Sequence, residues 1–105
     1  MNRGEIWYFD FKKPDKPRPV LILTRQEVIP YLDTVTIAPI TRTIRGIASE
    51  VVVGVAEGLK EKSVINLHHV MTIPKNSLRK FVGTVSDSTM SDVETAMLFA
   101  LGFDD

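Results

Sequence analysis

The side chains that could do chemistry in this 105-residue chain are mostly cationic. The sequence has no cysteine and two histidines, which excludes thiolate nucleophiles and disulfides and argues against a histidine-rich metal site. Residues 11–48 carry three acidic and seven basic side chains, a net charge of +4; the basic ones are Lys12, Lys13, Lys16, Arg18, Arg25, Arg42 and Arg45. A guanidinium presents a planar fork of donors that matches phosphate oxygens. Such a segment could bind phosphate groups.

The charge of the whole chain is zero, and its distribution is uneven. Residues 86–105 carry five acidic side chains and no basic one. Neutrality argues against a strongly basic nucleic-acid binder, but a dipolar domain can still present a cationic patch. On charge alone, two solvated faces of opposite sign are the favoured explanation.

The elements that must position these side chains are mostly strands. Length and an ordinary globular composition predict one domain over residues 1–105. Alternating or continuous apolar segments bounded by Pro and Gly predict about six strands, with a bend near the histidines in the fifth. These strands span residues 5–11, 19–23, 34–40, 49–53, 63–73 and 79–85, and residues 26–32 form a short helix or turn.

The last segment has the spacing of a helix. Ser86 or Ser88 supplies an N-cap, and Gly102 stands where a C-terminal cap belongs. A buried stripe is predicted between them, made of Met90, Val93, Met97 and Leu101 with Leu98 beside it. Short strands followed by one helix favour an α+β domain, a small curved antiparallel barrel closed by a C-terminal helix.

Several segments resemble, in order, the MazF/PemK toxins of bacterial toxin–antitoxin systems. The matching residues cover nearly the whole chain, and residues 18–25 and 35–46 are closest to the mycobacterial branch. The segments are Arg3-Gly4-Glu5-Ile6-Trp7, Arg18-Pro19-Val20-Leu21-Ile22, Ala38-Pro39-Ile40-Thr41, Gly58-Leu59, Ser63-Val64-Ile65, Thr72-Ile73 and Gly83, followed by the Ser-capped helix.

The resemblance implies a fold and an activity. The fold is an SH3-like antiparallel barrel of the MazF/PemK/CcdB type with a terminal helix, usually in a homodimer. The activity is sequence-specific, metal-independent cleavage of single-stranded RNA, which leaves a 2′,3′-cyclic phosphate and a 5′-hydroxyl. The family's catalytic arginine and threonine fall here on Arg18 and Thr41.

The chemistry of these two side chains suits that reaction. Arg18 can stabilise the charge of a dianionic phosphorane, and such preorganised charge is usually the largest catalytic contribution. A guanidinium stays protonated, so we do not assign it the role of general base. Thr41 can hydrogen-bond the phosphate or relay a proton; the alternative is a hydroxyl bonded to its own loop backbone.

Further basic side chains are candidates for binding RNA phosphates, a role that gives affinity rather than sequence selectivity. We assign it to Lys12, Lys13, Lys16, Arg42, Arg45 and His69, with a solvated loop as the alternative for the lysines. His68 and His69 depart from the family pattern. Adjacent strand residues point to opposite faces, so at most one histidine should face the site. A histidine satisfied by hydrogen bonds is the alternative for either.

The resemblance also implies partners and alternatives. The expected partners are single-stranded RNA, a second copy of the chain and a MazE-like antitoxin whose acidic segment fills the cationic groove; no cofactor or metal is expected. No apolar run approaches the roughly 20 residues of a membrane span, and the N-terminus lacks the apolar core of a signal peptide, which predicts a cytoplasmic protein. The alternatives are a gyrase-poisoning toxin of the same fold, which cleaves nothing, and an SH3-like RNA-binding module.

Overall fold

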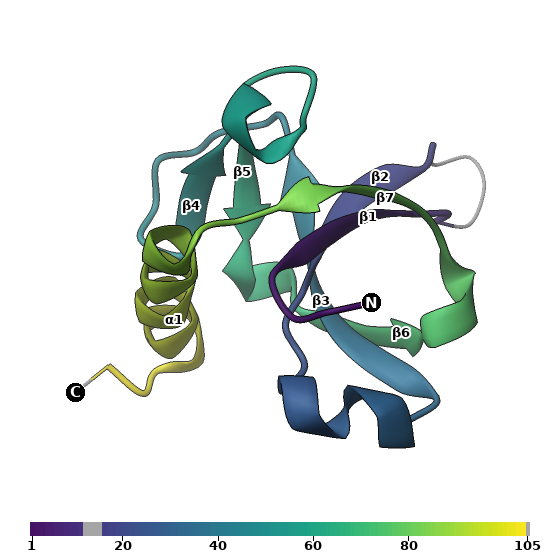
Figure 1. Ribbon diagram of the computed structural model, residues 1–105. Helices are drawn as coiled ribbons and strands as arrows, with labels where there is room; N and C mark the ends of the chain where they lie inside the picture. The colour runs from purple at the N-terminus through teal and green to yellow at the C-terminus, as the bar shows by residue number, and fades with distance from the viewer. Residues whose placement is uncertain (12–15, 105) are drawn as a thin grey trace.

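The computed structural model describes residues 1–11 and 16–104, which form seven strands, four 3-10 turns and one α-helix (Figure 1). The strands are β1 (Glu5–Phe9), β2 (Arg18–Ile22), β3 (Thr34–Thr41), β4 (Glu50–Val53), β5 (Ser63–Asn66), β6 (Met71–Pro74) and β7 (Leu78–Thr84). The 3-10 turns are η1 (Gln26–Tyr31), η2 (Val55–Glu57), η3 (Leu67–His69) and η4 (Lys75–Ser77), and the helix is α1 (Asp87–Leu101).

The strands form one antiparallel sheet in the order β4-β5-β3-β2-β1-β7, and β6 pairs with β3. The eight-residue β3 joins its two parts: its first half pairs with β6 and its last two residues pair with β5. A strand shared in this way curves the sheet into a small open barrel. The predicted α+β fold with a terminal helix is therefore confirmed.

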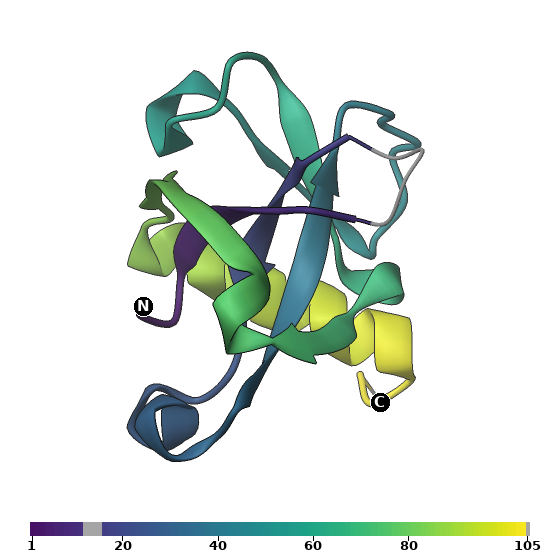
Figure 2. The same cartoon turned by 90° about the vertical axis from the view of Figure 1, so that its right-hand side faces the viewer.

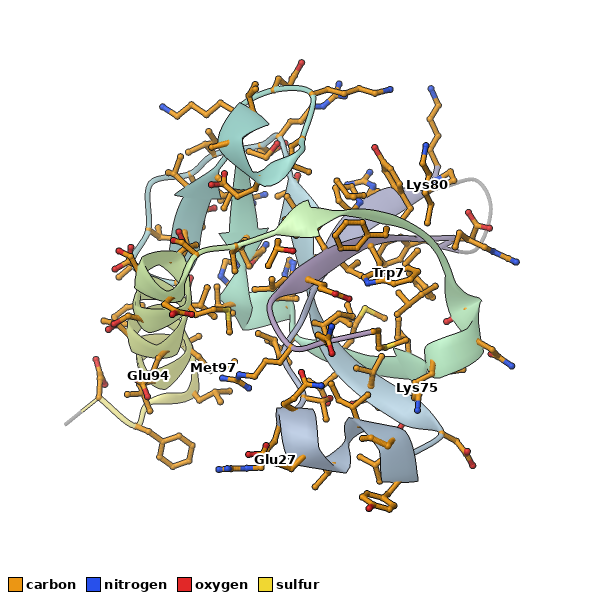
Figure 3. The ribbon with its side chains drawn as sticks, viewed as in Figure 1. Trp7, Glu27, Lys75, Lys80, Glu94 and Met97 are labelled. Atoms are coloured by element: carbon orange, nitrogen blue, oxygen red, sulfur yellow. The ribbon has the colours of Figure 1, made fainter. Side chains whose placement is uncertain are left out.

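Alternation along β1, β2 and β3 divides the apolar side chains between two cores. One core, which includes Ile6 and Leu21, packs under α1, β4 and β5. The other, which includes Val20 and Ile37, lies inside the barrel and is covered by β6. Figure 2 shows α1 behind the strands and β7 in front of them, and Figure 3 shows Trp7 pointing into the barrel. Both faces of the central strands are thereby buried.

The ends of α1 follow the prediction, and its buried stripe follows it in part. The Ser86 hydroxyl accepts the Thr89 N–H at 3.1 Å, and Gly102 has φ 78° at the C-cap. Val93 is buried, and Met90 and Met97 pack against the core beside it, as predicted. The predicted Leu98 and Leu101 are 40% and 58% exposed, because Ala96 and Ala100 complete the core-facing side instead. Among the described residues, no helix is long and apolar enough to cross a membrane.

The predicted strand over residues 63–73 is wrong in one respect. It is two strands, β5 and β6, separated by η3, which contains both histidines. Both pair antiparallel with β3, Ile65 opposite Ile40 and Met71 opposite Ile37, so the chain keeps its direction along β3. Six positions of this segment face only three of β3, and the extra residues form η3. This break accounts for seven strands where about six are predicted. The first strand also ends at Phe9 instead of residue 11.

Candidate functional site

A pocket of about 920 Å³ opens where β2 begins and β3 ends. Its described lining comes from β1, β2, β3, β5 and the loop before β5: Tyr8, Lys16, Pro17, Arg18, Pro19, Ile40, Thr41, Arg42, Thr43, Leu59, Lys60, Glu61 and Ser63. The pocket brings together four of the residues predicted from the sequence, Lys16, Arg18, Thr41 and Arg42. The predicted Lys12 and Lys13 lie outside the described residues.

Strand register explains why Arg18 and Thr41 meet. β2 and β3 pair antiparallel, and the pairing ends with Val20 opposite Pro39. Arg18 and Thr41 each lie two residues beyond this last pair, at the same end of the two strands. The two side chains, 23 positions apart in sequence, therefore come to line one pocket.

The Thr41 hydroxyl has one local contact. Its oxygen accepts the backbone N–H of Thr43 at 3.2 Å, which is the contact anticipated by the alternative interpretation of this residue. Because the oxygen acts as acceptor there, its own proton stays free to be donated into the pocket. The local bond also orients the hydroxyl at the end of β3.

The cations of the pocket differ in their pairing. Arg42 Nε lies 3.3 Å from Glu61 Oε1, and both side chains are more than half exposed. No described carboxylate forms a salt bridge with Lys16 or Arg18. The two unpaired side chains flank Pro17, at the edge nearest Thr41. An anion entering the pocket therefore meets a guanidinium that has no internal counterion among the described residues.

The first strand supplies an aromatic side chain that the sequence analysis left without a role. Alternation along β1 turns Trp7 into the barrel core, where its ring packs edge-on against Phe81 at 5.9 Å, and turns Tyr8 to the pocket. Trp7 Nε1 also donates to Glu5 Oε1 at 3.0 Å. Partial burial alone would raise the pKa of Glu5, but this bond and those from Asn2 outweigh it and lower that pKa.

The loop before β5 supplies Leu59, which lies in one of the segments that resemble the family, and Lys60 and Glu61, which no sequence pattern singled out. The loop is held by close backbone packing between η2 and β7. A Cβ at Gly83 would lie 2.0 Å from the Glu57 carbonyl oxygen, and one at Gly58 would lie 2.5 Å from the Val82 carbonyl oxygen. Only glycine permits this approach, which fixes the loop beside the end of β3.

Two of the predicted RNA-binding residues lie elsewhere. His69 is in η3 and does not line the pocket, and neither does Arg45. The expectation that the two histidines point to opposite faces of a strand is wrong, because they lie in a 3-10 turn with ring centroids 4.6 Å apart. The Arg45 backbone N–H donates to Glu50 instead, at 3.1 and 3.3 Å to its two oxygens. A role for either residue in RNA binding stays a prediction.

Residues 1–11 and 16–104 contain no group of three or more His, Cys, Asp or Glu side chains placed to hold a metal ion. The chemistry that the pocket offers is that of fixed cations, one carboxylate and hydroxyl groups. Such a set can bind a phosphate, stabilise added negative charge on it and hydrogen-bond its oxygens.

Comparisons with known sequences converge on one family. The model of the "PemK-like, MazF-like toxin of type II toxin-antitoxin system" matches residues 2–101. Endoribonuclease MazF3 of Mycobacterium tuberculosis (strain H37Rv) is 44% identical over 88 residues, which are 84% of this chain and 82% of that protein. The probable endoribonuclease MazF5 of the same strain is 35% identical over 100 residues, 94% of this chain and 91% of that one.

Comparisons with solved structures point to the same family as the sequence comparisons. The Mycobacterium tuberculosis toxin MazF-mt6 superimposes with a TM-score of 0.88 at 40% identity, covering 96% of this chain and 99% of that one. An endoribonuclease in complex with its cognate antitoxin, from a mycobacterial species, gives a TM-score of 0.86 at 26% identity, with coverage of 97% and 95%.

Proposed function

The chain belongs to the PemK-like, MazF-like toxins of type II toxin–antitoxin systems, and we propose that it is a sequence-specific endoribonuclease that cuts single-stranded RNA at Arg18 and Thr41. The observation that carries the choice of site is that β2 and β3, paired as far as Val20 and Pro39, bring an unpaired guanidinium and a hydroxyl into the lining of one cationic pocket. The relatives named as endoribonucleases support the activity.

The proposed reaction is an internal transesterification. The ribose 2′-oxygen attacks the adjacent phosphorus, so that an O2′–P bond forms and the P–O5′ bond breaks. The 2′-hydroxyl loses its proton and the 5′-oxygen gains one. The products are a 2′,3′-cyclic phosphate and a 5′-hydroxyl, and the proposal assigns no metal or cofactor to the step.

Arg18 supplies the main electrostatic contribution in this proposal. The phosphorane carries one more negative charge than the phosphodiester, and a guanidinium fork can bond two of its oxygens at once. Because no described carboxylate pairs with Arg18, no internal ion pair has to be broken when the phosphate arrives. Thr41 donates its free proton to a phosphate oxygen while its own oxygen stays bonded to the Thr43 N–H.

Other lining residues bind the rest of the strand. Lys16, Arg42 and Lys60 contact neighbouring phosphates and give affinity that falls with salt. Tyr8 offers its ring to an unpaired base, because single-stranded RNA is recognised largely by stacking on aromatic side chains.

The proposal includes the partners expected from the family. A cognate antitoxin, as in the mycobacterial complex, would silence the pocket with an acidic segment that competes with RNA for the same cations. A homodimer would bring two such pockets together. An antitoxin and cellular RNA are both encountered in the cytoplasm, where we place the protein.

The test is incubation of the purified protein with a long single-stranded RNA in EDTA, followed by mapping of the new ends. We expect discrete cuts at one recurring sequence, each with a 5′-hydroxyl end. RNA left intact by folded protein would overturn the proposal and favour the gyrase-poisoning or RNA-binding alternatives. A strict requirement for added magnesium would overturn the mechanism.

A further inference from the structure

A carboxylate stands among the cations of the pocket. Of the described residues that line it, Glu61 is the one acid, beside Lys16, Arg18, Arg42 and Lys60. A carboxylate repels phosphate, so a pocket that bound only the RNA backbone would be better without it. The position of Glu61 therefore calls for a ligand group that donates hydrogen bonds.

Glu61 is held in place from its backbone. The hydroxyl of Ser63, a residue only 5% exposed, donates to the Glu61 carbonyl oxygen at 3.1 Å. The same loop is fixed at its beginning by the contact of Gly58 and Gly83 with neighbouring backbone. The side chain thus projects from a fixed point on the pocket wall, as a residue that discriminates between ligands must.

The present partner of Glu61 is easily exchanged. Arg42 Nε meets one carboxylate oxygen, Oε1, at 3.3 Å, and the two side chains are 67% and 57% exposed. Ion pairs this exposed contribute little to stability because water screens them. The second oxygen, Oε2, forms no hydrogen bond to a described residue and is open to a ligand.

We infer that Glu61 reads a base of the bound RNA and selects guanine. Two parallel carboxylate oxygens match the two parallel donors of a guanine Watson–Crick edge, N1–H and N2–H. Cytosine, adenine and uracil each offer a single donor group on that edge, N4–H2, N6–H2 or N3–H, beside a ring nitrogen or carbonyl acceptor that repels the second carboxylate oxygen. This inference rests on the proposed function, since it places single-stranded RNA in the same pocket.

The exchange also releases Arg42. When guanine takes both oxygens of Glu61, the Arg42 guanidinium loses its internal partner and is free to bind a phosphate. Base reading and phosphate binding are then coupled through one ion pair, and an RNA without guanine at this position leaves Arg42 paired.

The test is selection from a randomised single-stranded 2′-fluoro RNA library, which lacks the attacking 2′-hydroxyl and is read out by binding alone. For the native protein we expect one position in the bound pool to favour guanine about tenfold over each of the other three bases. Glu61→Gln should abolish that preference, and Glu61→Asp should retain part of it. Glu94→Gln, a matched loss of charge on the outward side of α1 (Figure 3), should leave it unchanged.

Arg42→Gln separates base reading from mere positioning of Arg42. It should weaken binding of guanine-containing RNA most and reduce the salt dependence of that binding, while guanine stays preferred, less strongly than in the native protein. A guanine preference unchanged in Glu61→Gln would overturn the inference. So would a native pool with no preferred base, or an equal loss of preference in Arg42→Gln.

Cleavage of ordinary RNA by the same proteins keeps the two proposals apart. Guanine selection that depends on Glu61 but without cuts would overturn the nuclease and support base reading. Cuts at the same sequences by the native protein and by Glu61→Gln would support the nuclease and overturn base reading.

Discussion

Two polar regions of this small barrel differ in how much hydrogen-bonding capacity they leave free. In the pocket, Lys16 and Arg18 have no salt bridge to a described carboxylate, and the Thr41 hydroxyl keeps its proton available. These groups are solvated by water, which a ligand can replace. The pocket is therefore polar without being committed to internal partners.

The second region, which we call the histidine turn, consists of Ser49, Glu50, Asn66, His68 and His69. Ser49 Oγ and His68 Nδ1 are 2.6 Å apart, and Asn66 Nδ2 lies 3.1 Å from His69 Nδ1. The Asn66 oxygen accepts the His68 N–H at 3.3 Å, which orients the amide so that its nitrogen donates to His69. The buried polar side chains of this region, Ser49 and Asn66, are therefore hydrogen-bonded within it.

Burial accounts for the difference. Ser49 and Asn66 are each 3% exposed, and a buried polar group without a partner would cost stability. The pocket side chains stand at the mouth of the barrel, where water serves as partner. The presence of polar residues alone therefore does not indicate a functional site. Polar groups that are accessible and have no internal hydrogen-bond partner do indicate one.

The sharpest test of this comparison removes the unpaired guanidinium. Arg18→Ala should lower the cleavage rate by about 10²–10³-fold or more, because loss of a preorganised donor to the developing charge has that effect in enzymes. Initial rates on a defined RNA, with circular dichroism to confirm folding, measure it. Arg25→Ala, a matched change beside η1 and outside the pocket lining, should keep nearly the native rate. Native activity in folded Arg18→Ala would place the chemistry elsewhere.

A smaller loss should follow removal of the free hydroxyl. Thr41→Val keeps the shape of the side chain and removes its proton donor, so the rate should fall by about 10- to 100-fold, the value of one hydrogen bond to a charged group. Thr41→Ser should recover most of the activity. Thr34→Val, at the exposed opposite end of β3, is the control. Equal rates for Thr41→Val and the native protein would show that the hydroxyl only orders its own loop.

The sequence alone predicts those residues of the pocket that lie in recognisable local motifs. The family motifs locate Arg18 and Thr41, which the antiparallel pairing of β2 with β3 then brings to the same pocket. Lys60 and Glu61 were not predicted, because they reach the pocket only through the pairing of β5 with the end of β3. That pairing joins segments that share no sequence pattern, so it cannot be predicted from either segment alone.

The errors in the predicted fold also come from contacts between segments that are distant in the sequence. Residues 63–73 are apolar enough for one strand, but the segment has more residues than the stretch of β3 that it follows, and the excess forms the 3-10 turn Leu67–His69. The stripe on α1 has helical spacing throughout, yet Ala96 and Ala100 face the core where Leu98 and Leu101 were expected. Periodicity indicates that a helix has an apolar face, but where apolar residues lie on more than one side it does not say which of them the core covers.

The histidine turn should respond in the opposite way to the pocket. Asn66→Ala removes a buried donor and acceptor and should lower the free energy of unfolding by about 1–3 kcal/mol, with little change in the cleavage rate of the folded protein. Urea denaturation and cleavage assays at a temperature well below the transition measure the two effects. A large loss of activity at native stability would assign the histidine turn to the site and contradict the comparison.

The smallest effect should come from the edge of the histidine turn and depend on pH. Desolvation would raise the pKa of Glu50, but hydrogen bonds from the backbone N–H groups of Gly46 and Arg45 outweigh it and lower that pKa. A carboxyl with a lowered pKa stabilises the fold while it is ionised, and that stabilisation is lost as the pH falls through its folded pKa. Glu50→Gln should therefore be less stable than the native protein near pH 7 and approach it below about pH 4. Urea midpoints from pH 3 to 7 test this: a difference that stays constant with pH would show that the carboxylate charge does not hold the loop.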